Sequence, residues 1–416
     1  TPRISNDIEN SGINPNDAEE SIAYATPLML LRVFAIPRRY QQICQFAIFI
    51  LPLRPMRSII YIVLATAAVL SLAIRCDGGG DRATYTSPAP QQDIVACDTV
   101  RLIFGGDLMQ HLPQVEAALR ADGVYDYSRS FEYVAPLFRD ADFAVVNLET
   151  TLTTSGRYSG YPCFASPPAL ADHMADMGID LALLANNHCC DRMSRGIDTT
   201  IEQLDRCNIR HTGVYRDSLD YLTNNVQYFD CRGIRFALLN YTYGTNGIPV
   251  PRGRYVNIID TLSIKRDIAT INRDSIDCLI ACMHWGYEYM SQPNREQRSL
   301  RAMLAREGVD IVIGGHPHVV QPYEQDSLGI VYYSLGNLVS NQQRRYCDGG
   351  IIAEIEVVRC DTLPHLTYRA SAHPVWVLCP DYRILPQSVA DTLQMSDEAR
   401  QRYNQFISDT ERVLRR

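Results

Sequence analysis

Five short polar clusters hold the residues of this chain that are best suited to chemistry. They are Gly105-Gly106-Asp107, Asn147-Leu148-Glu149, Asn186-Asn187-His188, His284-Trp285-Gly286 and Gly314-Gly315-His316-Pro317-His318. Asp, Glu, Asn and His without Cys form an oxygen and nitrogen ligand set, suited to Mn²⁺, Fe or Zn²⁺ rather than to a thiolate-bound structural zinc. A carboxylate such as Glu149 can bridge two ions, and such ions activate water and neutralise charge on a transferring phosphoryl group. We therefore expect one or two divalent metal ions.

The elements that position these clusters are short apolar, β-branched runs alternating with amphipathic stretches, a pattern typical of an α/β protein with buried strands. Strands are predicted at Val100–Phe104, Phe143–Asn147, Asp180–Leu184, Ile234–Asn240, Cys278–Met283, Val309–Ile313, Ile330–Ser334 and Ile351–Val358. Helices are predicted at Pro113–Ala121, Pro168–Met177, Gly196–Cys207 and Glu296–Arg306. The clusters follow five of these strands. Because ligands collect at the carboxyl ends of strands in open α/β sheets, we expect the clusters to converge on one site.

The Gly-Gly pair before His316 and His318 predicts a tight turn. Glycine adopts turn conformations without steric cost, so we expect the glycines to supply this turn. Both imidazoles could then point inward, although they are only two residues apart.

The clusters also resemble a known family when they are taken in order. GGD, VNLE, ANNH, MHWG, GGHPH and YSLGN, which span Arg101 to Val339, look like the motifs of the CapA capsule-synthesis (poly-γ-glutamate synthesis) family. That family belongs to the calcineurin-like metallophosphoesterase superfamily. The resemblance implies a layered α/β/β/α sandwich and a part in capsule or poly-γ-glutamate synthesis, export or anchoring. It does not by itself name a reaction.

The resemblance also assigns roles by motif. The implied metal ligands are Asp107, the bridging carboxylate Glu149, Asn187, His284, His316 and His318. His188 corresponds to a non-ligand histidine that protonates a leaving group, and Glu288 has no counterpart. Two positions depart from the superfamily: Met109 stands where a ligand histidine would be, and Asn147-x-Glu149 replaces a GDxxD pattern. One ion is therefore a ligand short unless His111 or water substitutes.

Less specific interpretations stay open for several of these residues. Asp107 and Glu149 could cap helices instead of binding metal. Asn147 could be a ligand or a neighbour of one, whereas Asn186 is expected to orient its turn. The loop Tyr158–Pro168 could face a substrate or merely pack on the surface. We interpret the following as structural: His173, His211, His365, His373, the Cys189-Cys190 pair, and Ser334, which lacks a GxSxG context.

The N-terminal region indicates export. The uncharged run Ser58–Ile74 follows Arg54 and Arg57, which predicts a signal peptide or membrane anchor over residues 58–76 with the rest of the chain outside the cytoplasm. Met56-Arg57 resembles a signal-sequence start, so residues 1–57 are interpreted as an extension that need not be native. Cys76 resembles a lipoprotein acylation site, although Arg75 departs from that pattern. Residues 77–98 read as a flexible linker.

The remaining chain divides into a CapA-like domain at residues 99–345 and a C-terminal extension at 346–416. The extension is expected to add a strand and one or two helices that pack on the domain. A net charge of -8 without a basic stripe argues against a nucleic-acid partner. The thirteen cysteines contain no CxxC pair, so their pairing cannot be read from the sequence.

Two functions follow from these observations. The first is an extracytoplasmic metal-dependent hydrolase of the cell envelope, acting on a phosphoester or an envelope polymer; retention of His188 favours it. The second is a non-catalytic polymer-binding or export scaffold on the same fold, which the missing histidine at position 109 favours. A cytoplasmic nucleotide phosphodiesterase is disfavoured by the Ser58–Ile74 segment.

Overall fold

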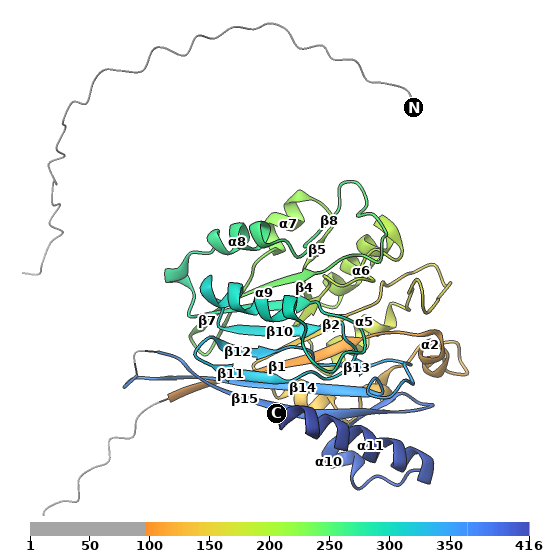
Figure 1. Ribbon diagram of the computed structural model, residues 1–416. Helices are drawn as coiled ribbons and strands as arrows, with labels where there is room; N and C mark the ends of the chain where they lie inside the picture. The colour runs from red at the N-terminus through yellow and green to blue at the C-terminus, as the bar shows by residue number, and fades with distance from the viewer. Residues whose placement is uncertain (1–96, 364, 416) are drawn as a thin grey trace, which may run out of the picture. The chain divides into compact units, whose positions relative to one another are not determined.

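The apolar runs form two sheets in a computed structural model that describes residues 97–363 and 365–415 (Figure 1). The order of the first sheet is β16 (Arg383–Pro386), β15 (Thr367–Leu378), β14 (Gly349–Cys360), β1 (Cys97–Leu108), β2 (Phe143–Leu148), β3 (Leu181–Leu183) and β4 (Arg210–Thr212), with β13 (Asn337–Val339) also paired to β1. The second sheet has the order β11 (Tyr323–Asp326), β12 (Gly329–Tyr332), β10 (Ile311–Gly315), β9 (Cys278–His284), β7 (Ile234–Thr242) and β6 (Gln227–Cys231). β5 (Val214–Tyr215) and β8 (Tyr255–Val256) form a small third sheet.

Strands β1 to β4 run parallel, as do β7, β9, β10 and β12. The carboxyl ends of the strands in each of these sets therefore lie at one edge of their sheet. All eight predicted strands are present. The strands that were not predicted are β4, β5, β6, β8, β11, β13, β15 and β16. β14 pairs with β1 along most of its length in the first sheet.

The helices account for the outer layers. They are α2 (Leu112–Ala118), α3 (Ser128–Phe131), α4 (Ala135–Arg139), α5 (Ala169–Met177), α6 (Met193–Arg206), α7 (Ser218–Asn224), α8 (Thr261–Ala269), the 3-10 helix η1 (Arg273–Ser275), α9 (Arg295–Arg306), α10 (Gln387–Ala390) and α11 (Asp397–Leu414). The four predicted helices correspond to α2, α5, α6 and α9, and the predicted C-terminal helices to α10 and α11. At α9, Asn294 caps the first turn and Gln297 completes a capping box, which fixes where the helix begins after β9.

Alternation along the strands separates the layers. Leu102 and Phe104 of β1 pack toward the second sheet, in a core with Ile280 and Ile313, while Ile103 between them joins a core on the opposite face. That opposite core includes residues of α5 and α6, and a third core joins α8 and α9 to the outer face of the second sheet. The layers therefore run helix, sheet, sheet, helix, as predicted. Packing of α11 on β15 and β16 forms a further small core.

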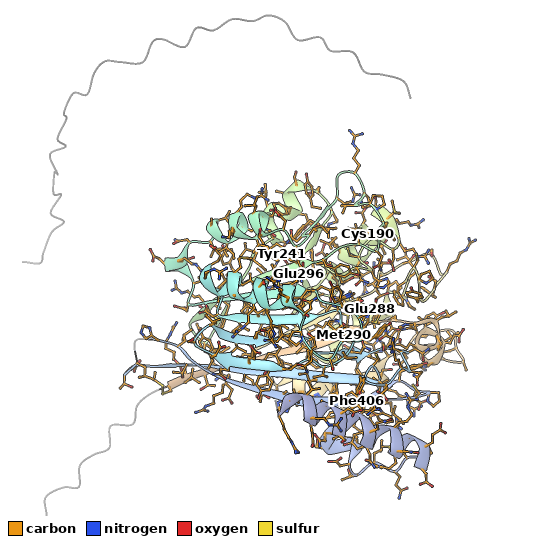
Figure 2. All side chains as sticks on the ribbon, viewed as in Figure 1. Cys190, Tyr241, Glu288, Met290, Glu296 and Phe406 are labelled. Atoms are coloured by element: carbon orange, nitrogen blue, oxygen red, sulfur yellow. A yellow bond between two sulfur atoms is a disulfide. The ribbon has the colours of Figure 1, made fainter. Side chains whose placement is uncertain are left out.

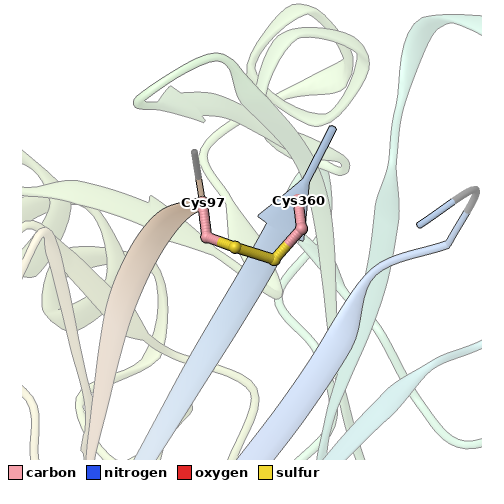
Figure 3. Close-up of a disulfide and its surroundings, with 2 residues drawn as sticks. All are labelled: Cys97 and Cys360. Atoms are coloured by element: carbon pink, nitrogen blue, oxygen red, sulfur yellow. A yellow bond between two sulfur atoms is a disulfide. The ribbon is translucent and has the colours of Figure 1, made fainter. Parts of the chain in front are cut away.

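A disulfide joins Cys97 to Cys360 where β1 begins and β14 ends (Figure 3). The two residues are register partners in the antiparallel pair. Within residues 97–363 and 365–415, no helix has the length and apolar character that crossing a membrane requires. The predicted signal or anchor, the Cys76 acylation site and nearly all of the predicted linker lie outside the described residues.

Candidate metal centre

Asp107 and Glu149 come from the ends of two adjacent parallel strands. Asp107 pairs with Asn147 in the register of β1 and β2, and the Asn147 amide Nδ2 donates a 2.8 Å hydrogen bond to Asp107 Oδ1. The same amide lies 3.5 Å from Glu149 Oε2. Asp107 lies within β1 and Glu149 follows β2, so neither caps a helix. Asn147 thus holds the two buried carboxylates in place.

The second sheet contributes the imidazoles. His284 ends β9, where it pairs with Gly315 of β10. The backbone N–H of His316 donates to Asp107 Oδ2 at 3.2 Å, and His318 Nδ1 lies 3.2 Å from the same oxygen. Asp107 is therefore the residue at which the two sheets meet.

The turn at the end of β10 differs in detail from the prediction. The left-handed backbone lies at His316 (φ 96°) and His318 (φ 56°), not at the glycines. The glycines are needed for close packing: a Cβ on Gly314 would collide with the Tyr333 carbonyl, and one on Gly315 would lie 2.7 Å from Asp107 Oδ1. The expectation that the glycines supply the turn was wrong. Positive φ costs a non-glycine residue roughly 1–3 kcal/mol, so the surrounding fold imposes this conformation.

Asn187 and His188 follow β3 and face different parts of the site. Asn187 Oδ1 lies 2.6 Å from His284 Nε2. His188 Nδ1 instead lies 2.8 Å from Asp191 Oδ2, with both side chains buried. Asn186 shapes this turn, as predicted, because its Oδ1 accepts from the His188 N–H and its Nδ2 donates to the Leu148 carbonyl.

Two groups of ionisable side chains could hold an ion among the described residues. Asp107, Glu149 and His318 form the first, and Glu288, His316 and His318 form the second; in each, the ligand atoms lie within 4.8 Å of one another. Two atoms of these residues, Glu149 Oε1 and His316 Nδ1, are buried without a hydrogen-bond partner. Unpaired buried polar atoms are costly, and oxygen and imidazole donors are those that divalent ions use. The residues present therefore fit a divalent metal.

The electrostatics agree with this fit. Burial raises the pKa of Glu149 well above its usual range, and the negative charges of Asp107 and Glu288 raise it further. Burial would also raise the pKa of Asp107, but the hydrogen bonds from His318 and Asn147 outweigh it and lower that pKa to about 2. Burial, with neighbouring imidazoles, lowers the pKa of His316 to about 3 and that of His284 well below its usual value. Neutral imidazoles are the form that binds metal.

Neither Met109 nor His111 serves as the ligand that the superfamily's histidine provides at position 109. Met109 is buried in the core, and neither group of possible ligands contains His111. His111 instead begins α2: its backbone N–H donates to Gln114 Oε1 at 2.9 Å, and its Nδ1 accepts from the Asn341 N–H at 3.3 Å.

The structure adds residues that the sequence did not single out. Asp191 is three positions after His188, a spacing that could have suggested the contact. Asn246 lies in the segment between β7 and β8: its Oδ1 accepts from Asn187 Nδ2 at 3.2 Å, and its Nδ2 lies 3.4 Å from His188 Nε2. Tyr243, in the same segment, packs on His316 with ring centroids 4.4 Å apart. The Asn246-Gly247 dipeptide signalled a turn, but nothing in the sequence connected it to the site.

The loop Tyr158–Pro168 reaches His188 through two aromatic rings. Phe164 is buried against the imidazole, with ring centroids 4.6 Å apart, while Tyr161 lies 6.4 Å from it and is 74% exposed. Residues 158–163 line an open cavity of about 510 Å³ together with His111, Arg192 and Asn341. The loop thus combines packing with an exposed surface beside the site.

Several residues that we interpreted as structural from the sequence make ordinary ion pairs or hydrogen bonds. His173 pairs with Asp126, His211 with Asp220 and His373 with Glu354. Ser334 Oγ donates to the Val319 carbonyl at 2.8 Å, as expected of a turn residue. Cys189 and Cys190 are buried in the core on the helix side of the first sheet. Fold and site together define an α/β/β/α protein with a buried oxygen and nitrogen donor cluster where its two sheets meet.

Sequence comparison identifies the family. The sequence pattern of the family described as "Bacterial capsule synthesis protein PGA_cap" matches residues 101–342, more than half of the chain. The chain therefore belongs to this family, which confirms the resemblance of its motifs.

Two curated relatives agree with this assignment. The PGA biosynthesis protein CapA of Bacillus subtilis is 26% identical over 259 residues, which are 61% of this chain and 66% of that protein. The capsule biosynthesis protein CapA of Bacillus anthracis is 25% identical over 252 residues, which are 57% of this chain and 59% of that protein. The matched region thus spans less than two thirds of either relative.

Solved structures show more distant likenesses. An NAD nucleotidase of Haemophilus influenzae is 11% identical with a TM-score of 0.39, covering 76% of this chain and 61% of that one. A 5'-nucleotidase of Candida albicans is 11% identical with a TM-score of 0.39, covering 75% and 58%. Because both TM-scores are below 0.5, the family assignment rests on the sequence matches alone.

Proposed function

We propose that this capsule-synthesis protein is a metal-dependent hydrolase that acts outside the cytoplasm on a phosphoester or on a cell-envelope polymer. The observation that carries the proposal is the placement of His188. Its Nδ1 is taken by Asp191, while its Nε2 points toward Asn246 beside the candidate ligand Asn187. A structural ion would need no such oriented histidine next to its ligands.

Each residue has a distinct part in this proposal. Asp107, Glu149, Asn187, His284, His316 and His318 would hold one or two divalent ions, Mn, Fe or Zn. When bound, the ions would activate water and neutralise charge on a phosphoryl group. Asp191 accepts the Nδ1 proton of His188 and so fixes the ring, which leaves Nε2 as the atom that transfers a proton to a leaving group.

The proposed location is the cell envelope. The Ser58–Ile74 segment would serve as a signal peptide or anchor, or Cys76 as a lipid attachment site, and the folded part would meet its substrate outside the cytoplasm. The Cys97–Cys360 disulfide supports this location, because disulfides persist in oxidising compartments. The proposed partners are the membrane, through the N-terminal segment, and an envelope polymer or phosphoester. Nucleic acid is not among them.

A second candidate function is a non-catalytic polymer-binding or export scaffold. The buried Met109, which stands where the superfamily has a ligand histidine, favours it. An incomplete ligand set could keep an ion for structure without supporting turnover.

The test is to purify the full chain with Mn²⁺, measure bound metal, and assay phosphodiester and γ-glutamyl substrates. We expect His188→Ala to lower kcat about 10²–10⁴-fold while leaving bound metal unchanged. His373→Ala, at a partly exposed histidine paired to Glu354 away from the site, is the matched control. A folded protein without metal would refute the hydrolase. Metal without turnover of either substrate class would favour the scaffold.

A further inference from the structure

Glu288 lies in the segment between β9 and α9, which is held against the turn that carries His316 and His318. The backbone N–H of Trp285 donates to the Gly315 carbonyl at 3.1 Å, and the backbone N–H of Tyr289 donates to the Pro317 carbonyl at 2.8 Å. Further along, Gln321 Nε2 donates to the Met290 carbonyl at 2.8 Å. These contacts on both sides of Glu288 fix its backbone beside the two histidines. Figure 2 labels Glu288 and Met290 in this segment.

The side chain of Glu288 points toward the same pair. One carboxylate oxygen and one nitrogen from each of His316 and His318 lie within 4.8 Å of one another. The two imidazoles are buried, and His316 Nδ1 has no hydrogen-bond partner. The carboxylate itself is exposed, so this side of the centre is open to solvent. Two imidazoles and one carboxylate with an open side are a ligand arrangement that divalent ions use in catalytic sites.

A solvent-exposed carboxylate without a ligand is the simpler interpretation, and two observations weigh against it. His318 belongs to both groups of possible ligands, so Glu288 faces the same centre as Asp107 and Glu149. His316 Nδ1, a buried atom of the same group, has no hydrogen-bond partner among the described residues. A cation beside the imidazole would give this atom a partner.

We infer that Glu288 is a metal ligand, which acts with His316 and His318 and supplies the donor that the centre lacks because position 109 is methionine. The inference rests on the proposed metal-dependent function and deepens it. Glu288 comes from the second sheet's β9–α9 segment rather than from β1. The donor set is therefore completed from a different element.

The experiment compares Glu288→Gln with Glu296→Gln in the full chain, using Mn²⁺ alone as the probe. Both changes remove one negative charge from an exposed glutamate, and Glu296 lies in the first turn of α9 (Figure 2). Calorimetry and Mn²⁺ spin-resonance spectra give affinity, stoichiometry and ligand symmetry without any assay of turnover. We expect Glu288→Gln to lose one ion or to bind it about tenfold or more weakly, with a changed spectrum, and Glu296→Gln to stay within about twofold of wild type. Glu288→Asp, which keeps the carboxylate, should restore part of the affinity.

The outcomes separate this inference from the function on which it rests. Equal Mn²⁺ binding by wild type and Glu288→Gln would overturn the assignment of Glu288 and leave the metal centre intact. A wild-type chain that binds no Mn²⁺ would overturn both. Weaker binding by Glu288→Gln without hydrolysis by wild type would support Glu288 as a ligand and refute only the hydrolase.

Discussion

Asn246 connects two neighbouring residues that have different proposed roles. Its amide oxygen accepts from Asn187 and its amide nitrogen lies next to His188 Nε2. Asn246 and Gly247 both have positive φ, and the Ile248 N–H donates to the Thr245 carbonyl at 2.9 Å, which closes a turn of the type that Asn-Gly favours. The side chain can therefore be changed without disturbing the turn, because glycine also accepts this backbone.

At the residue scale we predict that Asn246→Gly weakens Mn²⁺ binding and lowers kcat, each about tenfold, without lowering the melting temperature. The amide that orients Asn187 and His188 is lost, while the turn is kept. Calorimetry, steady-state kinetics and thermal unfolding measure the three quantities. Asn246→Asp should keep near wild-type metal affinity, because its carboxylate still accepts from Asn187. Its kcat should stay as low as that of Asn246→Gly.

Asn208→Gly is the matched control, since Asn208 is exposed, has a φ of 57° and lies beyond the C-terminal end of α6. It should change none of the three quantities. If Asn246→Gly changed only the melting temperature, Asn246 would be a turn residue and nothing more.

Residues next to strand ends were predictable from the sequence, and residues that reach the site from loops were not. Asp107 and Glu149 come from the ends of adjacent parallel strands, so their proximity follows from strand geometry. His284 ends a strand of the second sheet, and its approach to them depends on how the two sheets pack. Asn246 and Glu288 enter through segments whose paths depend on tertiary contacts. The backbone of His316 could not be foreseen either, because its positive φ is imposed by packing around Gly314 and Gly315.

At the scale of elements, α7 is attached to β4 through Asp220 and His211. Asp220 Oδ1 lies 3.1 Å from His211 Nε2, and Asp220 Oδ2 accepts from the Arg216 N–H at 2.8 Å. Burial would raise the pKa of Asp220, but the hydrogen bonds from His211 and the Arg216 N–H outweigh it and lower that pKa below its usual range. Asp220 therefore stabilises the folded state as long as it is ionised.

We predict that Asp220→Asn lowers the free energy of unfolding by about 2 kcal/mol at pH 7. A carboxylate with a lowered pKa contributes its full stability above its unfolded pKa of about 3.9, and loses it as the pH falls toward the folded value. The difference between wild type and variant should thus shrink by about 1 kcal/mol at pH 3. Urea unfolding at both pH values measures this.

Asp205→Asn is the control for this prediction. Asp205 pairs with Arg216 at 2.9 Å on the exposed side of the same region, so its loss should cost less than about 1 kcal/mol. A difference for Asp220→Asn that did not depend on pH would contradict the assigned role of its charge.

The elements themselves show where sequence patterns suffice. Buried strands such as β9 and β10 are continuous apolar runs, and their positions were predicted. β13 has three residues and β15 mixes polar and apolar positions, because much of it is half exposed. Their pairing partners are set by tertiary packing, so β13 beside β1 was not predictable from local pattern.

At the scale of the whole molecule, the Cys97–Cys360 disulfide closes a covalent loop with a sequence separation of 263. We predict that reduction lowers the free energy of unfolding by about 2–5 kcal/mol, because the unfolded chain gains conformational freedom. Denaturant unfolding with and without dithiothreitol measures the effect. Cys360→Ser should show the lower stability in both conditions, and an unchanged midpoint for reduced wild type would contradict the prediction.

Strand β1 has the disulfide at its first residue and Asp107 near its last. If residues before Cys97 tether the protein to a membrane, as proposed, mechanical tension would enter the fold at Cys97. The disulfide would pass this load to β14, so the hydrogen bonds of β1 would not break one after another from that end. The site at the far end of the strand would be shielded from strain, and its donor atoms would keep their positions under tension.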